Sequence, residues 1–343
     1  MSVKKSRCLR WPLLLVLAVA PIWAQRQPHT FFKNQPKLSD SDIQKIDRGE
    51  IVTKVLDSSD QYGLLVFGAV YVKAPIEKFA DVYRDVEKLQ QEKVYLVVKK
   101  LSDPPRLSDF DRFAVDRRDI DTLQSCKPGD CDIQVMNIEE FQRQVNWNAP
   151  NKYAEANAKI RARVFEGVDR YMKGGLRAMG SYRDRSNPLN LYRSMKDMVD
   201  GSQYIRADRA ADIRRHVVEF PSGRMAGAED IFYWENIDFG QGPVARVNHV
   251  TIFPDGFGVA KVIAANKQLY ASKYMRMALQ MYYCVPDTQN TSRRGFYLIQ
   301  MNDSRLPDFG SLKLRVVRAV ATGKAVEGTR DTLEILRRRM ESN

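Results

Sequence analysis

Alternating apolar residues near the start of the chain predict two paired strands and a helix. The segments EIVTKVL (50–56) and LLVFGAVYV (64–72) are rich in β-branched and aromatic residues, and the turn-forming DSSDQYG separates them. Pro75 then stands where proline suits the first turn of a helix. Apolar residues from Ile76 to Tyr83 follow at helical spacing and form one apolar stripe. We therefore predict a hairpin that leads directly into an amphipathic helix.

The middle of the chain has helical periodicity. A strand pattern, VYLVVKKL (94–101), precedes a Pro-Pro break, and the pattern changes after it. Residues 153–179 are rich in alanine and carry apolar residues in steps of four, with an interruption at the glycine pair 174–175. Shorter helical patterns cover 189–200 and 208–219. This part is predicted to be mostly helical.

Strand patterns return from residue 229, and a helix ends the chain. The segments DIFYWENIDF, VARVNHVTIF, VAKVIAAN, MALQMYYCV and GFYLIQMN follow one another at spacings suited to an antiparallel sheet. Leu333, Leu336 and Met340 then recur at helical spacing, and three arginines fill the positions between the last two. The terminal helix should have one apolar face and one solvated face.

The order of these elements predicts an α+β fold. In this order, residues 50–101 and 229–341 resemble the helix-grip fold of the START-like (SRPBCC-type) lipid-binding superfamily. The resemblance implies a single domain over 50–343, in which a curved antiparallel sheet grips the long C-terminal helix and a cavity lies between them. Residues 102–228 would be a large, mostly helical insertion.

The resemblance has one long-range consequence. Residues 64–72 should pair in the same sheet as strands from 229–302, although more than 150 residues separate them. Stretches such as CKPGDCDIQV, IFYWENIDFG, LYASKYM and NDSRLPDFG are also similar to a family of exported bacterial proteins. That similarity implies an exported protein, but it does not imply any particular chemistry.

The first 24 residues have the pattern of a secretory signal peptide. Four basic residues precede the apolar WPLLLVLAVA (11–20), and PIWA ends at the small residue Ala24. A membrane anchor is the alternative, but ten apolar residues are fewer than the ~20 that a spanning helix needs. We predict a periplasmic or secreted protein. Residues 25–49, polar at first and without a period, should form a flexible leader.

The chain is basic, with a formal net charge of +13. Such a balance favours anionic partners, among them an anionic membrane surface. Nucleic acid is not expected as a partner of an exported protein, and no basic motif with interleaved aromatic residues is present. The charges are scattered along the sequence, so a solvated basic surface is the alternative interpretation.

Two cysteines flank a turn. Cys126 and Cys131 enclose Lys-Pro-Gly-Asp, which favours a tight reversal that brings the thiols together. In an oxidising compartment such a pair predicts a disulfide, with Cα atoms within about 7 Å. A redox pair and half of a zinc site are the alternatives. Cys284, within an apolar strand pattern, is predicted to be a buried small residue.

Motifs for catalysis and cofactors are missing from the sequence. It contains no HExxH, GxSxG, Walker A or GxGxxG motif, and we predict neither a cofactor nor a metal site. His249 alternates within a strand pattern close to Glu235 on the preceding one. Since two strands joined by a short turn can place residues opposite each other, this pair is a candidate acid–base couple. A structural role for His249 is the alternative.

Aromatic residues gather in the late strands and suggest a pocket with polar handles. An ordinary aromatic core is the alternative. Arg305, at a turn after a strand, is a candidate for holding a carboxylate or phosphate, or else for a structural ion pair with Asp303 or Asp308. The candidate ligand-binding residues are Tyr233, Trp234, Tyr270, Tyr274, Arg305 and Leu336.

Three functions follow from these patterns. The first is an exported binding protein that holds an apolar or lipid-like ligand in a helix-grip cavity. The second is an enzyme on the same scaffold, a hydrolase or cyclase-like catalyst that uses His249 and Glu235. The third is an envelope protein-interaction module that acts through the helical insertion. The missing motifs favour binding.

Overall fold

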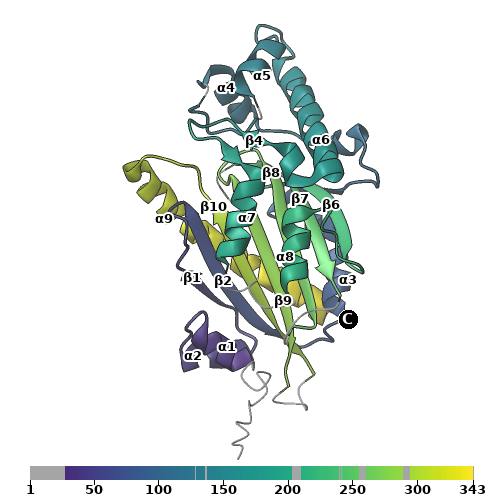
Figure 1. Cartoon of the computed structure of the whole chain (residues 1–343), viewed down its shortest axis with the longest axis vertical. Coiled ribbons are helices and arrows are strands. Elements are labelled where there is room, and N and C mark those ends of the chain that lie inside the picture. The colour runs from purple at the N-terminus through teal and green to yellow at the C-terminus, as the bar shows by residue number, and fades with distance from the viewer. Residues whose placement is uncertain are drawn as a thin grey trace, which may run out of the picture.

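An antiparallel sheet runs through the middle of the molecule, with helices on both of its faces (Figure 1). The computed structural model describes residues 28–127, 129–135, 137–202, 210–238, 240, 242–254, 260–288 and 294–342. The predicted signal peptide lies outside these residues.

The sheet has eight strands in the order β1-β2-β10-β9-β8-β7-β6-β3, and each neighbouring pair is antiparallel. Its strands are β1 (Val52–Leu56), β2 (Gly63–Val72), β3 (Tyr95–Lys100), β6 (Glu229–Ile237), β7 (Val244–Phe253), β8 (Val262–Ala271), β9 (Met277–Pro286) and β10 (Phe296–Arg305). Strand β2 pairs with β10 along its whole length, from Gly63 opposite Arg305 to Val72 opposite Phe296. The predicted pairing of residues 64–72 with the late strands is therefore confirmed.

Helices account for most of the remaining chain. The α-helices are α1 (Pro28–Asn34), α2 (Asp40–Asp47), α3 (Lys78–Arg84), α4 (Arg117–Ser125), α5 (Ile138–Gln144), α6 (Lys152–Met179), α7 (Leu191–Gly201), α8 (Ala210–Glu219) and α9 (Ser311–Glu341). Two short 3-10 helices, η2 (Val86–Gln91) and η3 (Leu107–Phe110), and a small hairpin, β4 (Ser181–Tyr182) with β5 (Leu189–Asn190), complete the elements. The predicted α+β class, with a curved sheet, a long C-terminal helix and a mostly helical insertion, is confirmed.

The two faces of the sheet carry different helices, and each has its own apolar core. Helices α3 and α9 pack on one face, where Phe79, Leu333, Leu336 and Met340 meet the apolar residues of β2, β9 and β10. The insertion covers the other face with α6, α7 and α8 (Figure 1). Because side chains alternate along a strand, neighbouring residues of one strand belong to different cores.

The predicted flexible leader is wrong for residues 28–47, because they form helices α1 and α2. Phe32 is fully buried, and its ring meets those of Phe67 and Tyr297 edge-on. Ile43 and Ile46 join the same core. These three apolar residues hold the segment on the sheet. They are too widely spaced in a polar stretch to form a regular pattern.

Within the insertion, α6 changes direction at Gly175, which confirms the predicted interruption. Gly175 has φ 66°, a left-handed conformation that only glycine adopts at little cost. A Cβ atom there would lie 2.0 Å from the carbonyl oxygen of Phe220. The turn of α6 and the approach of the segment after α8 thus both require a residue without a side chain.

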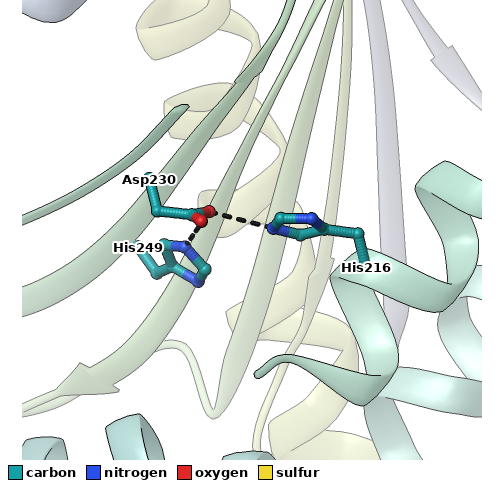
Figure 2. Close-up of side chains that lie close together, drawn as sticks. All are labelled: His216, Asp230 and His249. Atoms are coloured by element: carbon teal, nitrogen blue, oxygen red, sulfur yellow. Dashed lines mark hydrogen bonds and ion pairs between the residues drawn. The ribbon is translucent and has the colours of Figure 1, made fainter. Parts of the chain in front are cut away.

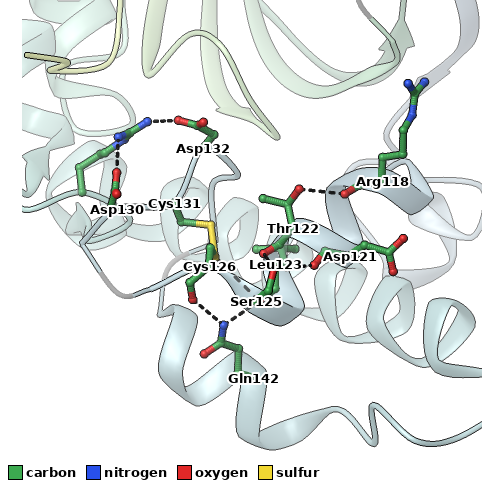
Figure 3. Close-up of a disulfide and its surroundings, with 11 residues drawn as sticks. Arg118, Asp121, Thr122, Leu123, Ser125, Cys126, Asp130, Cys131, Asp132 and Gln142 are labelled. Atoms are coloured by element: carbon green, nitrogen blue, oxygen red, sulfur yellow. Dashed lines mark hydrogen bonds and ion pairs between the residues drawn. A yellow bond between two sulfur atoms is a disulfide. The ribbon is translucent and has the colours of Figure 1, made fainter. Parts of the chain in front are cut away.

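The predicted cysteine pair lies at disulfide distance at the far end of the insertion (Figure 3). The Cα atoms of Cys126 and Cys131 are 5.3 Å apart. The side-chain amide of Gln142, on α5, donates to the backbone oxygens of Leu123 and Cys126 and so fastens α4 to α5. Cys284 is buried, as predicted, and burial raises the pKa of its thiol. Among the described residues, we find no helix with the length and apolar character of a membrane span.

Candidate functional site

A cavity of about 570 Å³ lies between the sheet and α9. Its inner wall is built by the face of β6 to β10 that α9 covers, and its outer wall by α9 and by the segment from α3 to β3. Asp119 and Thr122 of α4 and the loop residues Asp132 and Ile133 extend its rim into the insertion. Asp132 follows Cys131 directly, so the cysteine pair restrains one part of the rim.

The exposed surface of the cavity wall is mostly apolar, although polar and charged side chains also line it. Tyr83, Val86, Leu89 and Leu336 contribute ring and aliphatic surface. The polar groups on the strands are Tyr233 and Arg246 on β6 and β7 and carboxamides on β8, β9 and β10, while charged side chains come from α4, from loops and from α9. A mostly apolar surface with placed polar groups, around a space of several hundred Å³, is typical of sites for small organic ligands.

The outer wall is open along the first half of α9. Leu312, Val316 and Val320 are 77%, 63% and 53% exposed, although the rest of the helix packs closely on the sheet. Val316 and Val320 also line the cavity. Figure 1 shows the start of α9 projecting beyond the edge of the sheet. The apolar surface of this half is therefore continuous from the cavity to solvent.

Three of the six candidate ligand-binding residues line this cavity: Tyr233, Tyr274 and Leu336. Tyr233 lies on the inner wall and Leu336 on α9, while Tyr274 is 47% exposed at the rim. Burial raises the pKa of the Tyr233 phenol well above its usual value, which keeps this hydroxyl protonated as a hydrogen-bonding group.

Trp234 and Tyr270 do not line this cavity, contrary to the prediction, because both lie in the core beneath the insertion. Trp234 follows Tyr233 directly, and strand alternation therefore turns it to the opposite face, where its Nε1 donates to the backbone oxygen of Asp109 at 2.8 Å. The hydroxyl of Tyr270 donates to the backbone oxygen of Gln134 at 2.9 Å. Both polar tips are used to fix the insertion on the sheet.

Arg305 is also outside the cavity lining. Its guanidinium pairs with Asp60 at 2.8 Å, on the turn between β1 and β2, and not with Asp303 or Asp308. Asp308 instead pairs with Arg276 at 3.4 Å. The structural alternative for Arg305 was right in kind, but the partner comes from a turn some 240 residues earlier, which no local pattern indicates.

The predicted acid–base couple of His249 and Glu235 does not form, because the two residues lie on opposite faces. The register places Phe232 opposite His249 and Arg246 opposite Glu235. Glu235 is fully buried and binds Arg246 and the side-chain amide of Asn248. His249 stacks on Phe232 beneath the insertion, with ring centroids 4.3 Å apart.

His249 belongs instead to a buried cluster with His216 and Asp230 (Figure 2). Oδ1 of Asp230 lies 2.9 Å from Nε2 of His216 and 2.8 Å from Nε2 of His249, and it accepts from the hydroxyl of Thr251 at 2.9 Å. The cluster joins α8 to strands β6 and β7. The other carboxylate oxygen of Asp230, Oδ2, lies 3.0 Å from Nε of Arg224.

The protonation of this cluster follows from its surroundings. Nδ1 of His216 accepts the backbone N–H of Met225 at 3.0 Å, so a neutral His216 carries its proton on Nε2 and donates it to Asp230. Burial lowers the pKa of His249 to about 3, so the His249 ring is neutral. Burial alone would raise the pKa of the Asp230 carboxyl, but hydrogen bonds from the two histidines lower it well below its usual range.

These three residues have the ligand types of a metal centre, but their hydrogen bonds do not fit one. A metal on Nε2 of His216 would require the proton to move to Nδ1, where the Met225 N–H already points. None of the three lines the large cavity. The cluster is a hydrogen-bonded anchor between the insertion and the sheet. No sequence motif indicates this cluster, because its residues come from α8, β6 and β7 and only the packing of these elements brings them together.

Searches against protein-family models, curated proteins and solved structures found no match to this chain.

Proposed function

We propose that this protein binds an apolar or lipid-like ligand in the cavity beneath α9. The observation that carries the proposal is the cavity itself. At about 570 Å³ it falls within the roughly 300–1,000 Å³ of ligand sites, whereas a filled core would have close to crystal density. This is the arrangement that the START-like resemblance implies, and membership of that superfamily is part of the proposal.

Export to the periplasm or the medium is the proposed location. It rests on the basic start and apolar run of the first 24 residues and on a cysteine pair at disulfide distance. The enzyme alternative loses its support, because the two residues assigned to it lie on opposite faces of the sheet. The interaction-module alternative has no specific observation in its favour.

Filling the cavity should abolish ligand uptake. Ala321 lines the cavity from α9, and Ala321→Trp would place an indole in the space that the ligand needs. We expect the purified variant to carry at least about tenfold less co-purifying lipid than the wild type, because overpacking forces out the occupant. Mass spectrometry of organic extracts measures this.

The matched control is Ala319→Trp, two residues earlier on the same helix, exposed and outside the cavity lining. It should keep the lipid content of the wild type. Equal lipid in both variants, or a wild-type protein that takes up no apolar molecule from a lipid extract, contradicts the proposed function.

The first half of α9 is proposed as a contact for an anionic membrane surface. Residues 311–326 carry four basic side chains, Lys313, Arg315, Arg318 and Lys324, and no acidic one. They lie on a helix whose apolar residues are exposed, which is the composition of interfacial helices. Contact there would bring the open side of the cavity to the bilayer.

Vesicle binding tests this contact. We expect the protein to sediment with phosphatidylglycerol-containing vesicles and not with pure phosphatidylcholine. The double variant Leu312→Asp/Arg315→Glu, outside the cavity lining, should weaken binding by about tenfold or more, since each basic group near an anionic surface contributes about 1 kcal/mol. Leu107→Asp, at a 49% exposed leucine of η3, is the control. An equal loss for both variants would refute a specific role of α9.

A further inference from the structure

The inner wall of the cavity carries a band of uncharged carboxamides. They are Asn266 and Gln268 on β8, Gln280 on β9 and Asn302 on β10. Register places three of them side by side, with Asn302 opposite Gln280 and Gln280 opposite Asn266. Toward one end of the same three strands the α9 face is apolar, with Ala264 on β8, Cys284 on β9 and Leu298 on β10. The band is therefore an uncharged polar region on the inner wall of the cavity.

The side-chain amide donors of Gln268 and Asn266 are already used within the protein. Nε2 of Gln268 donates to the backbone oxygen of Met275 at 3.1 Å. A backbone carbonyl accepts and never donates, so this contact fixes the orientation of the amide and leaves its Oε1 as the free end. Nδ2 of Asn266 lies 3.2 Å from the Tyr233 hydroxyl and 3.4 Å from Oε1 of Gln280.

Two acceptor oxygens of the band remain open. Oε1 of Gln268, a residue that is 6% exposed, and Oδ1 of Asn266 are buried and have no hydrogen-bond partner among the described residues. Oε1 of Gln300, next to Asn302 on the same face, is in the same state. Buried polar groups in folded proteins almost always have a partner. These oxygens require O–H or N–H groups, which a ligand that enters the cavity can supply.

The charges on the cavity wall do not suit an anionic head group. Arg246 pairs with Glu235, and Lys273 pairs with Asp119 at 2.8 Å. Toward the open side, Lys313 and Lys324 lie 3.6 Å and 2.9 Å from Asp132 and Glu327. Arg339, the remaining lysine or arginine among the described lining residues, donates to the backbone oxygens of Val82 and Asp85. Each of these cations already has an acidic or a carbonyl partner, so none of them is reserved for a carboxylate or a phosphate.

We propose that the ligand is an amphiphile with an uncharged head that carries hydroxyl or amide hydrogens, and that this head binds the carboxamide band at Gln268 and Asn266. The apolar part lies beneath α9, against Leu336 and the valines of its first half. This inference rests on the proposed function, because it assigns the head-group class of a ligand for the same cavity.

Two lipids with the same acyl chain separate the head-group question from binding itself. Isothermal titration of the purified protein with 1-monooleoylglycerol and with oleate compares a neutral hydroxyl head with a carboxylate. We expect monooleoylglycerol to bind at least about tenfold more tightly, because its hydroxyls donate to the open oxygens. Gln268→Leu should weaken the binding of monooleoylglycerol by about tenfold and leave the affinity for oleate unchanged.

Gln134→Leu is the matched control. Gln134 donates to the same Met275 oxygen at 3.2 Å but lies outside the cavity lining, so either variant leaves that oxygen with one donor. The control should bind both lipids as the wild type does. If Gln268→Leu does not fold, Asn266→Leu on the same strand gives the same test, with the same expected loss.

The outcomes distinguish the two proposals. Oleate bound as tightly as monooleoylglycerol, or equal affinities for the wild type and Gln268→Leu, would overturn the neutral-head inference and leave the cavity as a binding site. If neither lipid binds, and the organic extract of the wild type is also empty, the proposed function is wrong and the inference falls with it.

Discussion

Replacing Asp230 with alanine is expected to lower the free energy of unfolding by about 3–5 kcal/mol, the cost of removing one partner from a buried charged cluster. The carboxylate accepts from His216, His249 and Thr251, and its own side chain is 5% exposed. Without it, two buried imidazoles lose their acceptor beneath the insertion. Chemical denaturation at pH 7, monitored by circular dichroism, measures the change.

The control for this prediction is Asp212→Ala on α8. Asp212 is exposed and pairs with Arg215 at 3.0 Å, so its loss should cost about 0–1 kcal/mol. The pH dependence gives a second check. Because the folded protein lowers the pKa of Asp230 below its ordinary 3.8, the contribution is complete above about pH 5 and is lost progressively as the pH falls toward the folded pKa. The wild type and the variant should therefore converge in acid. Equal effects of the two alanine variants at pH 7 would contradict the anchoring role.

The sheet and α9 were predictable because their signals are local and strong. Alternation in β2 and in the late strands, and the spacing of Leu333, Leu336 and Met340, depend only on which positions face a core. Predicting that β2 pairs with the late strands required the family resemblance as well, since no local pattern relates segments so far apart in the sequence. Helices α1 and α2 were missed because single anchors such as Phe32 leave no period in a short polar stretch.

The candidate site was predicted only in part, for reasons of geometry. Aromatic residues were assigned to one pocket by composition, but Tyr233 and Trp234 are neighbours in a strand and cannot share a face. Alternation shows which residues of one strand lie on the same face. It does not show which residues of the neighbouring strand lie on that face of the sheet, because this depends on the pairing register. A bulge between Val247 and Asn248 in the pairing of β7 with β8 shifts the register further. The His216–Asp230–His249 cluster depends on how α8 packs on the sheet, which the spacing of its residues does not encode.

Gly68 leaves no room for a side chain between β2 and α9, and Gly68→Val is expected to lower the free energy of unfolding by about 1–3 kcal/mol. A Cβ atom at this position would lie 2.6 Å from Cγ2 of Thr329 and 2.7 Å from Cδ1 of Leu333. Both partners are fully buried, so a larger side chain forces Thr329 and Leu333 into other rotamers or moves α9 away from β2. Since α9 forms the outer wall of the cavity, ligand uptake should fall with stability.

Gly68→Ala gives the sharpest form of this prediction, because two effects oppose each other in sign. On backbone entropy alone, glycine to alanine stabilises a protein by about 0.4–1 kcal/mol where the conformation allows it. Gly323→Ala, in α9 with no atom within 4 Å of the added carbon, should show that gain. At Gly68 the contact with α9 should outweigh it, so the free energy of unfolding should fall for Ala and fall further for Val. Stabilisation by Gly68→Ala, with ligand uptake unchanged, would contradict this prediction. It would mean that close packing of α9 on Gly68 does not hold the outer wall of the cavity in place.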